Sequence, residues 1–272
     1  MPIPNESEFV DGVRYLAGLI RLENKDPVFQ FTGGEPSVMP YFNKLLRAAQ
    51  GNSEPSAILV TNGSGSLEWW ESVLPYFRYV EISYHPQFAN VNHIIDVYRF
   101  IKKQDYPIDV KVMIHLSNDD QLWLKAVSVY EHLQMLLMKC GLKLLYSNFM
   151  RGNQYLPYKT YQLEYYYHAI GKEFNPSETV YNDTAISLNR RRHDIDHQTL
   201  TKEEFNFKDK LCHAGLDQLI VTAEGDVYRG WCKNNGKVGN IKERNIILPT
   251  EPTLCVDNYC RNGFDRQAKK II

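Results

Sequence analysis

The chain has 272 residues, which is enough for one large domain or two modest ones. Its 31 basic and 32 acidic side chains nearly cancel, so the composition gives no reason to expect nucleic acid or an anionic membrane as the main partner. The sequence has no apolar run of about 20 residues, as a membrane span needs, and its first eight residues lack the apolar core of a signal peptide, which favours a cytoplasmic protein.

The first 150 residues alternate helical and strand patterns. Apolar residues at helical spacing predict helices over residues 7–24, 40–50, 67–77, 91–103 and 122–139. Short apolar runs predict strands over residues 28–31, 57–61, 79–83, 110–116 and 142–147. Gly141 is expected to end the last of these helices. Strands separated by helices of this length are typical of parallel βαβ units, so the predicted fold is α/β with about five parallel strands.

The composition changes after residue 150. Residues 151–171 are rich in Tyr and contain a predicted helix over 161–168, whereas residues 172–210 are polar and carry turn signals. Four of the five cysteines come after residue 210. We therefore expect an α/β part over residues 1–150, a connector with a helix and a hairpin over 151–210, and a small cysteine-rich α+β domain over 211–272.

A glycine pair follows the first predicted strand. Gly33 and Gly34 lie at the carboxyl end of that strand, where ligands bind in parallel α/β folds. Glu35 places a carboxylate beside them, and a carboxylate suits a ligand ammonium because charge-assisted hydrogen bonds are stronger than neutral ones. The simpler alternative is a plain strand-to-helix turn with Pro36 near the helix start.

The order strand, Thr32-Gly33-Gly34-Glu35-Pro36, helix resembles the Gly-Gly-Glu-Pro motif of the radical S-adenosylmethionine (SAM) enzymes. In that family the motif binds the amino group of SAM, and the fold is a partial (βα) barrel. The resemblance continues at the ends of the next strands, in the segments 60–63 and 81–86. It therefore implies cofactor contacts from Gly33, Gly34, Glu35, Pro36, Asn62, Ser83 and His85. His85 also precedes a proline, so a purely structural turn histidine is the alternative.

The late cysteines form a possible metal set. Cys212, Cys232, Cys255 and Cys260 lie among glycine turns and polar neighbours. Four thiolates can close a zinc site or hold an iron–sulfur cluster, and the plain alternative is four buried free thiols. Cys140 stands apart from this set and is expected to be a core residue.

The spacing of these cysteines resembles the twitch or SPASM extension of radical SAM enzymes. Cys212, Gly225, Cys232, Gly239-Asn240 and the closing pair Cys255 and Cys260 follow its order, with a longer gap before Cys232 and a wider closing pair than is usual. The resemblance implies one auxiliary [4Fe–4S] cluster on the four cysteines. Zinc remains the alternative metal.

The family's C-x₃-C-x₂-C loop, which holds the cluster that cleaves SAM, does not occur in the sequence, and no cysteine precedes Gly33. Two explanations stay open: a truncated or split enzyme whose loop a further segment or partner chain supplies, or a pseudoenzyme. With the loop, we expect radical hydrogen abstraction from a peptide or small metabolite. A non-catalytic binding module and a zinc-stabilised α/β domain are the alternative functions.

Because the first βα unit of the barrel is lacking, we also expect helix 7–24 or a homodimer contact to cover the open sheet edge.

Overall fold

The computed structural model describes residues 5–50, 55, 57–105, 107–144, 158–174, 207–257, 265 and 268–271. The chain divides into two compact units. One unit comprises residues 20–174, and the other combines residues 1–19 with residues 175–272. The hairpin expected within 151–210 lies outside the described residues, as do the last residues of the strand predicted over 142–147.

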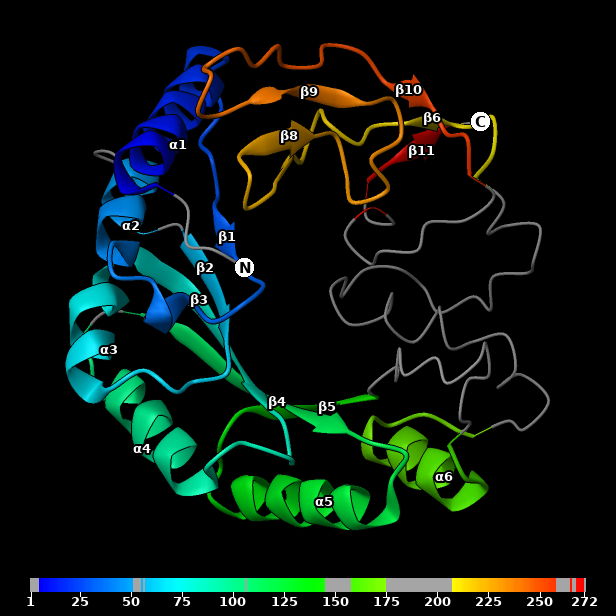
Figure 1. The fold of residues 1–272 in the computed structure, drawn as a ribbon. Coiled ribbons are helices and arrows are strands. Elements are labelled where there is room, and N and C mark those ends of the chain that lie inside the picture. Colours follow the sequence, from blue (N-terminus) through cyan, green and yellow to red (C-terminus); the bar gives the residue numbers. More distant parts are fainter. Residues whose placement is uncertain are drawn as a thin grey trace. The chain divides into compact units, whose positions relative to one another are not determined.

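The unit of residues 20–174 is built on a five-stranded parallel sheet in the order β1-β2-β3-β4-β5 (Figure 1). The strands are β1 (Gln30–Phe31), β2 (Ala57–Thr61), β3 (Phe77–Tyr84), β4 (Asp109–Leu116) and β5 (Cys140–Leu144). All four strand pairs are parallel. This arrangement confirms the predicted α/β class and the five parallel strands.

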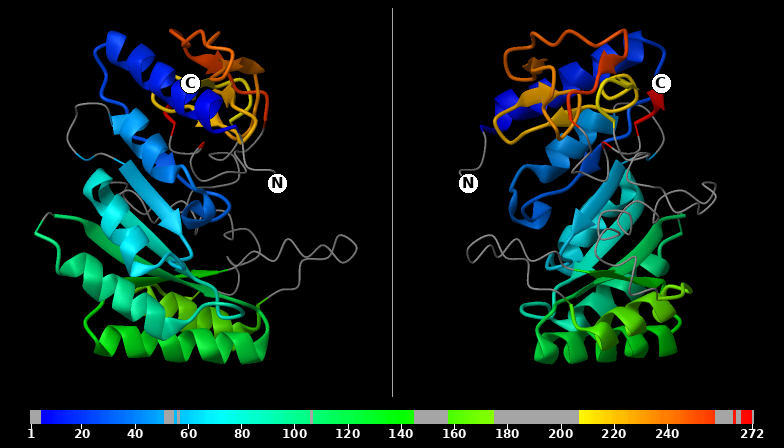
Figure 2. Two further views of the ribbon diagram at one scale, coloured as in Figure 1. Left: turned by 60° about the vertical axis from the view of Figure 1, so that its left-hand side comes forward. Right: turned by 90° about the vertical axis from the view of Figure 1, so that its right-hand side faces the viewer.

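Helices connect the strands and lie along one face of the sheet, as Figures 1 and 2 show. They are the short η1 (Pro36–Val38), α2 (Phe42–Gln50), α3 (Leu67–Val73) with η2 (Leu74–Tyr76), α4 (Val91–Lys102) and α5 (Asp120–Met135), and α6 (Thr160–Ala169) follows the last strand. Helices α3, α4 and α5 begin at side chains that accept the first free backbone N–H groups: Ser66, Asn90 and Asp119. The helix predicted over 161–168 is α6.

The two faces of the sheet differ because successive side chains of a strand point to opposite sides. One face is apolar; its members include Leu59, Val80, Ile82, Val112 and Ile114, all fully buried. The other face carries polar residues in neighbouring register positions, with Glu81 opposite Lys111 and His115 opposite Lys143. The apolar face supplies the core, and the other face brings polar side chains of neighbouring strands together.

The prediction for Gly141 is wrong. Helix α5 ends at Met135, and Leu137 rather than a glycine adopts a positive φ, of +56°, after it. Gly141 lies within β5, where an added Cβ would come within 2.8 Å of the Lys111 side chain on the neighbouring strand. The residue is small because Lys111 crosses over it.

The second unit contains helix α1 (Glu6–Leu22), whose residues up to Leu19 belong to it, and two three-stranded sheets. One sheet has the order β7-β8-β9, and the other has the order β10-β6-β11. Their strands are β6 (Leu211–Cys212), β7 (Ile220–Val221), β8 (Asp226–Tyr228), β9 (Lys237–Asn240), β10 (Thr253–Leu254) and β11 (Lys270–Ile271). Every pairing in these two sheets is antiparallel. In the described part of the chain, no helix has both the length and the apolar character needed to cross a membrane.

Helix α1 packs on the segment that follows β9 through a glycine. A Cβ at Gly12 would lie 2.8 Å from the carbonyl oxygen of Ile241, so the helix backbone sits directly on that strand end. An ion pair of 3.4 Å between Asp11 and Arg244 flanks the contact. Gly18, six residues later in the same helix, has no atom of the described residues within 4 Å of its Cβ position.

We therefore predict opposite effects of the same substitution at these two glycines. Gly12→Ala should lower the free energy of unfolding by about 1–3 kcal/mol, because overpacking forces the helix off Ile241. Gly18→Ala should raise it by about 1 kcal/mol, because alanine favours the helix and meets no described neighbour. Denaturant unfolding of both variants measures the difference, and equal effects would contradict the close approach at Gly12.

Candidate functional site

The carboxyl ends of the parallel strands form the candidate site. After β1, Gly33 and Gly34 adopt φ angles of +84° and +60°, a conformation that strongly favours glycine. An added Cβ at either position would meet no atom of the described residues within 4 Å. The two glycines are therefore required by the backbone turn, and no described side chain crowds their Cβ positions.

Glu35 fastens this turn to the neighbouring strand. One carboxylate oxygen accepts hydrogen bonds from the Thr61 hydroxyl at 2.7 Å and from the Ser37 amide at 3.1 Å. The other accepts the backbone N–H of Asn62 at 2.8 Å. Pro36 is buried and begins η1, as the turn interpretation expected. A carboxylate has about four acceptor positions, so Glu35 can still accept one more donor.

Asn62 joins this group mainly through its backbone. Its side-chain oxygen accepts the amide of Ser64 at 2.8 Å, and the Thr61 hydroxyl accepts the amide of Gly63 at 3.0 Å. The structure thus brings Glu35 and Asn62 together, at the ends of β1 and β2. The bonds to Thr61 and Ser37 were not predicted, although a hydroxyl at the end of the next strand was a visible signal.

Ser83 and His85 lie at the end of β3, and the ring of His85 contacts a residue of the neighbouring strand β4. The imidazole of His85 stacks on that of His115, with ring centroids 4.2 Å apart and planes 22° apart. His115 is only 6% exposed, and Ser83 is buried as well. Burial lowers the pKa of His85, and the positive charge of Lys143 lowers it further. His115 was missed because only the strand register brings it beside His85.

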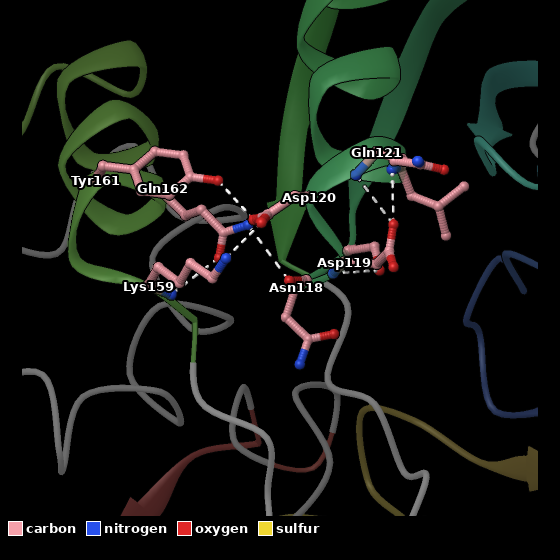
Figure 3. A network of polar contacts seen from close by, with 9 residues as sticks. Asn118, Asp119, Asp120, Gln121, Lys159, Tyr161 and Gln162 are labelled. Carbon is pink, nitrogen blue, oxygen red and sulfur yellow. Dashed lines mark hydrogen bonds and ion pairs between the residues drawn. The ribbon is translucent and has the colours of Figure 1, made fainter.

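At the end of β4, a polar network holds helix α6 (Figure 3). The Tyr161 hydroxyl donates to Asp120 at 2.6 Å, and Lys159 forms an ion pair with the same carboxylate. The buried Gln162 accepts the Lys159 amide at 2.9 Å and donates to the Asn118 carbonyl at 3.4 Å. The start of α6 is thereby fixed at the same edge of the sheet as the Glu35 turn.

The cysteines predicted as metal ligands belong to the other unit. Cys212 on β6 and Cys255 after β10 are buried in one small cluster with Ala214 and Ala268. Cys232, after β8, is exposed, and these three thiols are free of disulfides. Cys260 lies outside the described residues.

The three described thiols share a local arrangement. The amide of Ala214, two residues after Cys212, donates to the Cys212 sulfur at 3.4 Å. Burial raises the pKa of Cys232 and Cys255, and hydrogen bonds from the backbone two residues later, at Asn234 and Asp257, oppose that rise. A Coulombic interaction with Cys212 also raises the pKa of both other thiols.

The donor chemistry fits a soft metal or an iron–sulfur cluster, because thiolates are the ligands that such centres prefer. Among the described residues, however, no three His, Cys, Asp or Glu side chains gather closely enough to form a group that could hold a metal ion.

No protein-family model matches the chain. A search of curated protein sequences gives no match either.

The network at Asp120 predicts how the docking of α6 depends on pH. Hydrogen bonds from Lys159 and then Tyr161 lower the pKa of Asp120, so this stabilisation is present above the ordinary carboxyl value near 4 and is lost as the pH falls through the lowered pKa. The bond to Asp120 raises the pKa of Tyr161, so its contribution is present below about pH 10 and is lost as the pH rises through the raised pKa. The ring of Trp123 packs against Tyr165 of α6. The indole NMR signal of Trp123 should therefore shift twice, once as the pH falls through the lowered pKa of Asp120 and once as it rises through the raised pKa of Tyr161.

Asp120→Asn should abolish both shifts of the Trp123 signal. Asp109→Asn is the matched control, because it removes an ion pair of 2.7 Å with Lys139 at the opposite end of β4. An Asp120→Asn variant with the wild-type pH profile would show that other contacts hold α6.

Proposed function

We propose that this chain is an iron–sulfur protein of the radical SAM type. In this proposal the ammonium of SAM binds at the Gly33–Glu35 turn, and Cys212, Cys232, Cys255 and Cys260 hold an auxiliary [4Fe–4S] cluster. The main support is the Glu35 turn itself: two positive-φ glycines and a carboxylate at the carboxyl end of a parallel strand, bonded to the end of the next strand.

The fold is compatible with this function. Five sequential parallel strands with helices along one face would form the wall of a partial (βα) barrel, whose polar face would line the substrate space. The two small antiparallel sheets that carry the described cysteines would form the twitch-like domain. A peptide or a small metabolite would bind over the ends of β3 and β4, near Ser83 and His85.

The residues of this chain would bind and orient SAM. Glu35 has an acceptor position left for the ammonium, and no described side chain crowds Gly33 and Gly34, which would let the ligand approach the backbone. A three-cysteine [4Fe–4S] cluster, where one is bound beside SAM, supplies the electron that cleaves it. The printed sequence has no cysteine before Cys140, so a further segment or a partner chain would bring those three ligands. β1 and β5 are the end strands of the described sheet, where such a chain or a second copy could join.

A non-catalytic binding module on the same fold is the second candidate. One observation favours it: the Glu35 carboxylate already accepts three hydrogen bonds from its own chain. In that case the turn would be a structural joint, and ligand binding there would not depend on the charge of Glu35. Zinc on the four cysteines is the corresponding alternative to the cluster, since the same thiolates suit it.

Binding of SAM and of a SAM analogue without the amino group tests the proposal. A hydrogen bond to a charged group contributes ~1.5–3 kcal/mol. Glu35→Gln should therefore weaken SAM binding roughly 10–100-fold and leave the deaminated analogue unaffected, as measured by ligand-observed NMR titration.

Thr61→Val is the control, because it removes a bond to Glu35 but keeps the carboxylate. It should affect both ligands equally. If Glu35→Gln also weakens both ligands equally, the carboxylate only shapes the turn, and the binding module without ammonium recognition is the better account.

A further inference from the structure

The carboxyl ends of β3, β4 and β5 place three basic side chains in one row. Tyr84 lies opposite Ile114 in the register of β3 and β4, so the residues that follow them, His85 and His115, come side by side. Their imidazoles stack with ring centroids 4.2 Å apart. On the other side of His115, Lys143 of β5 lies directly opposite it. Because residues in register on neighbouring strands share a face of the sheet, the three side chains are neighbours.

The row has a buried centre and accessible flanks. His115 in the middle is only 6% exposed, whereas His85 is half-buried and Lys143 is exposed. The buried Ser83 lies two residues before His85, on the same face of the sheet. Imidazole, ammonium and hydroxyl groups can all donate hydrogen bonds. A ligand at this row would therefore meet several donors, some of which are already shielded from water.

The charges of the row favour an anion. Burial lowers the pKa of His85, and the positive charge of Lys143 lowers it further, because like charges repel. An anion bound between these side chains would offset that repulsion and accept charge-assisted hydrogen bonds. Four residues earlier on β3 and β4, the sheet instead places an acid, Glu81, opposite Lys111. The row at the carboxyl ends thus differs from the rest of this face in being entirely basic.

The same charges separate this row from the proposed SAM site. The sulfonium and ammonium of SAM are both cationic, and the proposed partner of the ammonium is the carboxylate of Glu35, at the ends of β1 and β2. Basic side chains at the ends of β3, β4 and β5 would repel these cationic groups. The carboxylate therefore suits the cofactor, and the basic row suits a second, anionic molecule.

We infer that His85, His115 and Lys143 bind an oxyanion of the substrate, which is a carboxylate or a phosphate group. This inference rests on the proposed function, which places the substrate over the ends of β3 and β4, and it narrows the substrate to anionic molecules. Lys143 supplies the positive charge at the exposed flank, and the two imidazoles supply N–H donors toward the buried centre.

The experiment titrates the full chain with inorganic phosphate and follows the imidazole NMR signals of His85 and His115, which should shift along a saturating curve. Lys143→Gln should weaken phosphate binding roughly 10-fold or more, because a hydrogen bond between charged groups is lost. Lys139→Gln is the matched control: it removes the same charge just before β5, where Lys139 pairs with Asp109 at 2.7 Å. It should leave phosphate binding unchanged.

A second variant and a second probe sharpen the test. His85→Phe keeps an aromatic ring beside His115 but removes the N–H donor, and should also weaken phosphate binding roughly 10-fold or more, as read from the His115 signal. Acetate in place of phosphate distinguishes the two kinds of oxyanion, since the probe that binds more tightly identifies the group on the substrate.

Three results would overturn the inference. One is the absence of saturable shifts at His85 and His115 with both probes. Another is equal weakening by Lys143→Gln and Lys139→Gln, which would show only a general attraction of anions to positive charge. The third is displacement of phosphate by SAM, which would assign the row to the carboxylate of the cofactor. Failure of the proposed function looks different: phosphate would bind at the row, and SAM would not bind the chain with or without phosphate.

Discussion

The strands of a parallel sheet all have their carboxyl ends on the same side of the sheet. The loops that follow the strands must supply hydrogen-bond partners for the polar groups gathered there. This constraint organises the unit of residues 20–174. At β1 and β2 it is met by the carboxylate of Glu35, which accepts donors from both strand ends. At the carboxyl ends of β3 and β4 the imidazoles of His85 and His115 stack on each other. At the end of β4, Asp120 binds the start of α6. The three polar clusters of this unit described above therefore lie at the carboxyl ends of its strands.

The other unit faces a different constraint, because two of its described cysteines pack in a cluster of small side chains. Its described strands have only two to four residues each. Cys212 and Cys255 pack with small neighbours such as Ala214 and Ala268, which bury little apolar area. Small units of this kind usually depend on a further cross-link such as a structural metal. The bonds of the buried Asp265 to the amides of residues 231 and 232 and the close contact of Gly12 with Ile241 show how much of this unit instead rests on specific backbone approaches.

The order of strands and helices could be predicted because each element has its own apolar pattern and cap. The turn at Gly33 and Gly34 was also visible, since a glycine pair after an apolar strand is a local signal. Contacts between strands could not be read in this way. Gly141 looked like a helix end, and only the register of β4 and β5 shows that Lys111 requires it to be small. The His85–His115 stack and the bonds of Asp265 to residues 231 and 232 likewise join positions about 30 residues apart, for which the sequence carries no local pattern.

The most direct test of a ligand site at the carboxyl edge of β1 and β2 is protein-observed NMR during a titration with SAM. The account predicts that the largest amide shifts fall on Gly33, Gly34 and Asn62, because the ligand ammonium would bind the carboxylate that joins their two loops. Amides on the opposite edge of the sheet, such as that of Asp109 at the start of β4, should stay in place. Shifts confined to other parts of the chain, or no shifts at saturating SAM, would contradict the account.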